Sequence, residues 1–174
     1  MSDPRFPIGQ FSLEGDMTPD TLHGFVEIIA NAPAEFREAV NGLNDAQLDT
    51  TYREGGWTIR QVIHHVADSH MNSYVRFKLA LTEDRPTIKP YAEDRWAEIE
   101  DAKHAGVEIS LRLIESLHAR WAVCLRSLTL EQWQRTFNHP ERGVVPLDEA
   151  AALYAWHCKH HLAHITTLRA QKGW

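Results

Sequence analysis

Apolar residues recur at helical spacing through most of the chain. The first such segment follows Thr18 and Pro19, which resemble a helix start: a threonine N-cap and then a proline at the first helical position, where its missing N–H costs nothing. Pro33 removes a backbone donor from this segment, so we expect a bent helix that ends near Leu43. Its apolar positions are Leu22, Phe25, Val26, Ile29, Phe36, Ala39, Val40 and Leu43.

Three more helices are predicted downstream. Thr58 and Gln61 form a capping-box pattern, which starts a second helix that runs to about Thr82. A third is clearest from Val107 onward, and a fourth opens near Asp148 and stops at Gly173. The apolar stripe of the third helix has spacings of three and four residues and consists of Leu111, Ile114, Leu117, Trp121, Leu125 and Leu128.

The connecting segments complete this picture. Residues 82–95, TEDRPTIKPYAEDR, carry two prolines and many charges, so they predict a long crossover loop between the second and third helices. The sequence FNHPERGVV, residues 137–145, favours a small two-stranded hairpin before the fourth helix. Residues 1–17 contain no helical pattern and are expected to form an extended arm. We therefore predict one all-α domain, residues 1–174, built as a four-helix bundle.

Composition narrows the setting in which this fold acts. With 174 residues, 43% of them hydrophobic and 24% charged, the chain is large enough for one compact core. The net charge is −6 and no basic stripe is present, which argues against nucleic acid as a partner. No uncharged run approaches the roughly 18 residues that a membrane span needs, and no signal peptide is evident. Because only two cysteines occur, a cytoplasmic location is expected.

Histidine is the unusual feature of the composition. Eleven are present, and four of them lie in WHCKHHLAH, at positions 157, 160, 161 and 164. Residues four apart on a helix can bring two imidazoles to one metal, and both His157 with His161 and His160 with His164 satisfy that spacing. On a helical wheel the apolar arc centres near His157 and His161, which favours this pair. His164 also falls near the centre, as a residue beside the site or in the core.

A third ligand is needed, because two imidazoles seldom make a strong site and no cysteine pair is available. The second helix supplies His64 and His65. His65 is favoured, since Ser69, Asn72 and Arg76 fall beside it and could form a wall of a substrate pocket. His64 projects roughly 100° away and is expected at solvent or an interface.

Three other residues have simpler interpretations. His70 and His118 are expected to be hydrogen-bonded core residues, because that is the usual role of a single histidine on an apolar helix face. Cys158 adjoins His157 but points off it, so packing is preferred to a role in ligation or nucleophilic catalysis.

Several long segments resemble the DinB-like superfamily, and within it the YfiT-type metal-dependent hydrolases. They are PIGQF, GGWTIRQVIHHVADSHMNSYVRFKLALTED, the TIKPY loop, LHARW and LYAWHCKHHLAHIT. The resemblance spans the chain and implies a four-helix bundle with a long crossover between its second and third helices. It also implies one zinc or nickel ion held by His65, His157 and His161, and a homodimer.

Three functions are compatible with such a site. Three imidazoles leave a metal position open for water or substrate, which favours hydrolysis of an ester or amide, although the strip beside His65 offers no carboxylate base. The same metal could instead ionise a small bacterial thiol for S-transfer, with Arg76 holding a carboxylate of that thiol. The third function is non-catalytic, with the metal stabilising a bundle that binds a partner. The resemblance favours the hydrolase.

Overall fold

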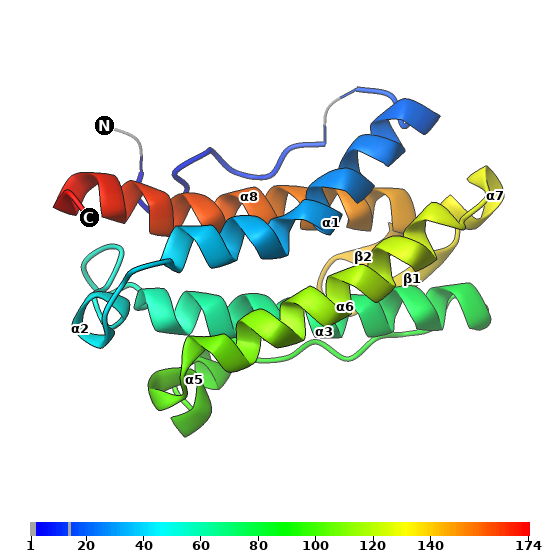
Figure 1. Cartoon of the computed structure of the whole chain (residues 1–174). Helices are drawn as coiled ribbons and strands as arrows, with labels where there is room; N and C mark the ends of the chain where they lie inside the picture. Colours follow the sequence, from blue (N-terminus) through cyan, green and yellow to red (C-terminus); the bar gives the residue numbers. More distant parts are fainter. Residues whose placement is uncertain (1–2, 14) are drawn as a thin grey trace.

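Four long helices dominate the computed structural model, which describes residues 3–13 and 15–174 (Figure 1). They are α1 (Pro19–Val40), α3 (Ile59–Thr82), α6 (Val107–Arg126) and α8 (Leu147–Lys172). Helix α1 packs against α6 and α8, and α3 packs against the same two helices. The predicted all-α four-helix bundle is therefore confirmed.

The helix starts follow the capping signals in the sequence. The Thr18 hydroxyl accepts a hydrogen bond from the backbone N–H of Thr21 at 3.2 Å. At the start of α3 the capping box is complete, because Thr58 accepts from the Gln61 N–H at 3.1 Å and Gln61 accepts from the Thr58 N–H at 2.9 Å. Such caps satisfy amides that have no partner within the helix.

The end of α1 differs slightly from its prediction. The helix ends at Val40 rather than near Leu43, because the chain turns at Gly42, which adopts a φ of 77°. Pro33 lies within α1 without ending it. Helix α8 ends as predicted, since Gly173 adopts the left-handed conformation that suits glycine beyond a helix terminus.

Short elements fill the connections. Helix α2 (Asp45–Leu48) lies between α1 and α3, α4 (Glu93–Trp96) and α5 (Glu100–His104) belong to the crossover, and α7 (Leu130–Trp133) follows α6. The predicted hairpin is present as β1 (Thr136–His139) and β2 (Gly143–Pro146), which pair antiparallel. The Asn138 backbone binds the crossover, donating to the Pro86 carbonyl at 2.9 Å and accepting from the Ile88 N–H at 3.0 Å. The hairpin thus holds the crossover against one end of the bundle.

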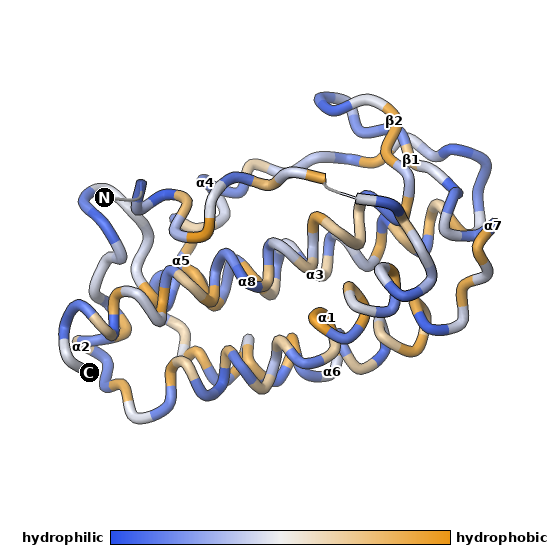
Figure 2. Tube along the Cα trace, turned by 90° about the horizontal axis from the view of Figure 1, so that it is seen from above, coloured by the Kyte–Doolittle hydropathy of each residue, from blue (hydrophilic) through white to orange (hydrophobic). Residues whose placement is uncertain are grey.

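The core is apolar but contains histidine. Apolar residues recur along the long helices (Figure 2), and the largest fully enclosed side chains include Phe36, Phe77 and Trp121. His70 and His118 are enclosed with them, each at 0% exposure. Among the described residues no helix is long and apolar enough to cross a membrane.

The N-terminal arm has a surface within its own chain. Its described part, residues 3–13 and 15–17, contains no helix and follows α8 (Figure 1). The Phe6 ring centroid lies 6.0 Å from that of His160, and the Phe11 centroid lies 6.0 Å from that of Trp156. The described part of the arm therefore packs on α8 of its own chain.

Candidate metal centre

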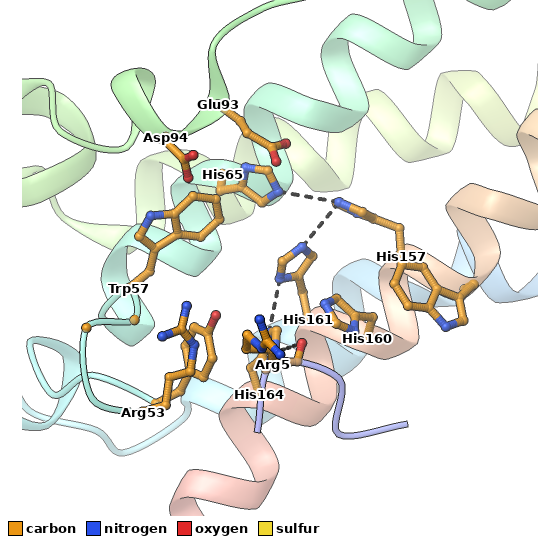
Figure 3. A pocket seen from close by; sticks show the side chains of 14 residues that line it. Arg5, Arg53, Trp57, His65, Glu93, Asp94, His157, His160, His161 and His164 are labelled. Atoms are coloured by element: carbon orange, nitrogen blue, oxygen red, sulfur yellow. Dashed lines mark hydrogen bonds between the residues drawn. The ribbon is translucent and has the colours of Figure 1, made fainter. Parts of the chain in front are cut away.

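Three imidazole rings meet where α3 packs against α8. His65 lies in the second turn of α3, whereas His157 and His161 lie one turn apart on α8. The Nε2 atom of His157 is 3.4 Å from Nε2 of His65 and 3.2 Å from Nε2 of His161. Figure 3 shows the three rings turned toward one another. The fold thus brings together the three histidines that the sequence analysis selected.

The spacing of these nitrogens fits a single divalent metal. Zinc binds histidine nitrogen at roughly 2.0–2.1 Å, so two ligands of a tetrahedral site stand about 3.3 Å apart. The two separations, 3.4 and 3.2 Å, match that edge. Three protein nitrogens would fill three corners of a tetrahedron and leave one open, which is the pattern of catalytic rather than structural zinc sites.

Burial keeps these rings uncharged. Desolvation, with smaller contributions from neighbouring histidines, lowers the pKa of His65 to about 3. The pKa values of His157 and His161 are held well below 6.5 by the same two causes. The Trp57 ring covers His65, with centroids 4.6 Å apart. At neutral pH the cluster therefore offers nitrogen lone pairs to a cation rather than positive charge.

A second histidine group, His160, His161 and His164, shares one member with the first. The Nε2 of His164 lies 3.2 Å from the Arg5 carbonyl, which can only accept, so His164 donates from Nε2 and its Nδ1 is left to accept. That Nδ1 lies 3.3 Å from Nδ1 of His161. A neutral His161 that donates from Nδ1 keeps one lone pair, at Nε2, which faces His157. The hydrogen bonds thus favour the first group.

Two cavities adjoin the three-histidine cluster. One has a volume of about 360 Å³ and is walled by the arm, the start of α3 and α8, with Arg53, Trp57 and Trp156 in its lining. The other has a volume of about 470 Å³ and extends along α3 toward the hairpin, with Arg76 and His139 in its lining. Both include His157, and both include residues of α4. The cluster is thus accessible from two sides.

Glu93 and Asp94 are the site residues that sequence reasoning missed. They begin α4 and line both cavities, and Figure 3 shows their carboxylates on the same side of the cluster as His65. Desolvation, with repulsion from Asp94 and Glu141, raises the pKa of Glu93. The strip beside His65 on α3 does lack a carboxylate, but the crossover supplies one. The only signal in the sequence is an acidic pair after a proline-bearing loop.

The three predicted wall residues have different placements. Ser69 is buried and lines the second cavity, with its hydroxyl 3.3 Å from the Tyr154 hydroxyl. Arg76 lines the same cavity. Asn72 donates to the Asp68 carbonyl at 2.9 Å and is not among the described residues that line either cavity. Ser69 and Arg76 can therefore meet a ligand, whereas Asn72 is turned back on its helix.

His64 is buried, so the expectation of solvent or an interface was wrong. Its Nε2 lies 3.1 Å from the Ala105 carbonyl and its Nδ1 lies 2.7 Å from the Ser110 hydroxyl. Because the carbonyl accepts from Nε2, Nδ1 accepts from Ser110, and both ring nitrogens are occupied. The segment that joins α5 to α6 covers this side of α3, which a helical wheel does not show.

The packing interpretations of three other residues are confirmed. His70 and His118 are fully buried and lie 2.7 Å apart, Nδ1 to Nε2. Cys158 is buried, and its burial raises the pKa of the thiol far above the usual range, which removes it as a nucleophile.

Comparison with known proteins agrees with this architecture. The family model described as the DinB superfamily matches residues 28–165. The chain belongs to the DinB superfamily. The matched region begins within α1 and ends within α8, so it includes all three histidines of the cluster.

Individual proteins match over nearly the whole chain. A protein of Bacillus cereus (strain 03BB102) and one of Bacillus thuringiensis subsp. konkukian (strain 97-27) are each 54% identical to it, with 100% of both chains covered. Both are named "Putative metal-dependent hydrolase". The solved structure of YfiT from Bacillus subtilis is 46% identical and superposes with a TM-score of 0.95 over 98% of each chain. It is described as a probable metal-dependent hydrolase with an unusual four-helix bundle topology.

Proposed function

We propose that this protein is a metal-dependent hydrolase whose divalent metal is held by Nε2 of His65, His157 and His161. The observation that carries the proposal is the convergence of three neutral imidazole nitrogens, 3.2 and 3.4 Å apart, at the junction of two cavities. The names of the matched relatives add support. Zinc is the proposed ion and nickel the alternative, since imidazole ligands suit both.

In this proposal the metal ion and the protein side chains contribute different parts of the hydrolysis. A divalent ion in a three-histidine site supplies a Lewis acid that polarises a carbonyl and lowers the pKa of water. Glu93 lines both cavities and is the carboxylate proposed to accept a proton from the attacking water. Trp57, whose ring packs at a tilt against that of His65, shields the proposed ligand from solvent. Arg53 brings positive charge to the first cavity and would bind an anionic part of the substrate.

The thiol S-transferase is kept as a second candidate because of the two cavities. A transferase must bring a thiol and an electrophile to one centre, and the cavities of about 360 and 470 Å³ meet at His157. Arg76 in the larger cavity could bind a carboxylate of the thiol. Conjugation of an electrophile that requires both thiol and metal, without hydrolysis of esters or amides, would support this function over the first.

Elemental analysis of chelator-free protein tests the site. About one equivalent of zinc or nickel per chain is expected in the wild type, and loss of that metal in His161→Ala. The matched control is His160→Ala, which removes a neighbouring imidazole that belongs only to the second group. A panel of esters and amides then tests hydrolysis by the loaded wild type. A metal-free wild type, or metal retained by His161→Ala and lost from His160→Ala, would contradict the proposed ligand set.

A further inference from the structure

A chain of hydrogen bonds runs from one proposed ligand through the whole bundle. Nδ1 of His157 on α8 lies 2.9 Å from Nε2 of His70 on α3. Nδ1 of His70 lies 2.7 Å from Nε2 of His118 on α6. Nδ1 of His118 lies 2.6 Å from the carbonyl oxygen of Ile29 on α1. The chain thus contains one residue from each of the four long helices.

This series of hydrogen bonds has a defined direction, which is set at the Ile29 end. The Ile29 carbonyl can only accept, so His118 donates from Nδ1 and, being neutral, accepts at Nε2. His70 must then donate from Nδ1 and accept at Nε2, and His157 must donate from Nδ1. Burial supports neutrality, since it lowers the pKa of His118 to about 4 and that of His70 well below 6.5. The remaining lone pair of His157 is at Nε2, facing His65 and His161.

Pro33 explains why the Ile29 carbonyl is available inside a helix. In an α-helix the carbonyl of residue 29 would accept from the N–H of residue 33, and proline has no N–H. The His118 side chain supplies the missing donor at 2.6 Å. Because Pro33 lies within α1, the Ile29 carbonyl is available as the last acceptor in this series of hydrogen bonds.

We propose that His70 and His118 are positioning residues that hold His157 in the Nδ1–H tautomer, so that its Nε2 is presented unprotonated to the metal. This inference rests on the proposed function, because it assigns His157 as a ligand. Ligating histidines commonly donate their second ring N–H to a fixed acceptor, and loss of that acceptor weakens metal binding. Here the acceptor is the imidazole of His70. The orientation of that ring is set in turn by His118 on α6 and the Ile29 carbonyl on α1.

The second ligand on α8 has an arrangement of the same kind. His161 donates from Nδ1 to His164, which donates from Nε2 to the Arg5 carbonyl of the arm. His64 makes a useful contrast, because it is equally buried on α3 but bonds only to Ser110 and Ala105. Its hydrogen bonds lead to no ligand, so it serves as a control for simple packing.

The tautomers of the metal-free wild type give the first test. Long-range proton–nitrogen NMR correlation of histidine side chains distinguishes Nδ1–H from Nε2–H rings. We expect His70, His118 and His157 as Nδ1–H, and His64 as Nε2–H. An Nε2–H tautomer at His157 in the folded, metal-free protein would overturn the proposal. This readout needs no metal, so it stands apart from failure of the proposed function, which a wild type unable to bind metal would show.

Metal affinity of a remote variant gives the second test. His118→Phe removes the acceptor of His70 without touching His157 and fills most of the same space. His70 would then be free to donate from Nε2, which forces His157 toward Nε2–H. We expect zinc affinity, measured by chelator competition, to fall about 10- to 100-fold. The control His64→Phe should weaken folding while leaving zinc affinity and the tautomer of His157 unchanged.

The paired variants separate positioning from packing. Thermal melting and circular dichroism establish that each variant is folded before its affinity is measured. A drop in zinc affinity in His118→Phe together with a changed His157 tautomer would support the positioning role of His70 and His118. Unchanged affinity in folded His118→Phe, or an equal drop in His64→Phe, would overturn it.

Discussion

At the scale of single residues, the chemistry of the site depends on hydrogen-bond direction as much as on residue type. Eleven histidines carry the same ring, yet their partners give them different roles. His64 has both nitrogens occupied, whereas His157 and His161 each keep an Nε2 lone pair that faces the same point. The carboxylate proposed for proton transfer is that of Glu93, a residue without any motif around it.

Replacement of Glu93 by glutamine tests its proposed role as a proton acceptor. The amide keeps the size and polarity of the side chain but cannot take a proton, so kcat for a hydrolysed ester should fall about 10²- to 10⁴-fold. Metal content should stay at the wild-type level, because Glu93 is not a proposed ligand.

Asp94→Asn is the matched control for that experiment. Asp94 precedes Arg95 in the same short helix and lines the same cavities, and we expect it to have the smaller effect on kcat. An unchanged kcat in metal-loaded Glu93→Gln would show that another group acts as the base. A larger loss of kcat in Asp94→Asn would assign that role to Asp94.

At the scale of helices and strands, local signals were sufficient for most boundaries. Capping residues mark the starts of α1 and α3, and a left-handed glycine marks the end of α8. These signals are local because they involve a side chain and the backbone a few residues away. The crossover was predicted only as a loop; its short helices α4 and α5 contact α3, and its residues 86 and 88 bond to the hairpin.

The capping box of α3 offers a direct test of this local control. Thr58→Ala should lower the free energy of unfolding by about 1 kcal/mol, because one amide of the first turn loses its acceptor. Chemical denaturation measures the change. Thr82→Ala is the control at the opposite end of the helix, where the hydroxyl donates back to the Lys78 and Leu79 carbonyls of the same helix, and it should have little effect. Equal losses in the two variants would remove the capping explanation.

At the scale of the whole molecule, the bundle is built around neutral histidines. Burial lowers the pKa of His118 and His160 to about 4 and that of His65 to about 3, from an ordinary value of 6.5. In the unfolded chain these rings take up protons as the pH falls below 6.5, while in the folded chain they do not until about pH 4. Acid therefore favours unfolding.

The metal-free protein should accordingly lose stability with acid. The free energy of unfolding should be nearly constant above pH 7 and should decrease as the pH falls from about 6.5 to about 4. Asp68, whose pKa burial raises to about 6, and Glu93, whose pKa burial also raises, act in the opposite direction, but they are two carboxyls against several rings. Urea titrations across this range measure the slope. A flat profile would show that the buried rings take up protons in the folded chain as readily as in the unfolded chain.

His118→Phe is the control for that titration. It removes one buried ring that must stay neutral, so its stability should depend less steeply on pH than that of the wild type. An identical slope would mean that His118 does not contribute.

The homodimer remains a prediction. It follows from the family resemblance, and the N-terminal arm packs on α8 of its own chain. One chain has a mass of 19.9 kDa, and light scattering at working concentration should give twice that mass. A mass of one chain would reject the dimer.

The sequence by itself determined the four long helices, the hairpin and the long crossover, and it predicted the trio of His65, His157 and His161. Periodicity and capping are properties of neighbouring residues, and a helical wheel can place two histidines on one face. From the sequence, Pro33 was interpreted only as a bend in the first helix. His70 and His118 were interpreted only as core residues.

Only the tertiary structure decided how those residues act together. Residues 29, 70, 118 and 157 lie on four different helices, and their contacts depend on how the helices pack. The same holds for Glu93, which reaches the cluster because the hairpin holds the crossover beside α3. Hydrogen-bond direction depends on which acceptor a ring meets, and that acceptor can be more than a hundred residues away in the chain.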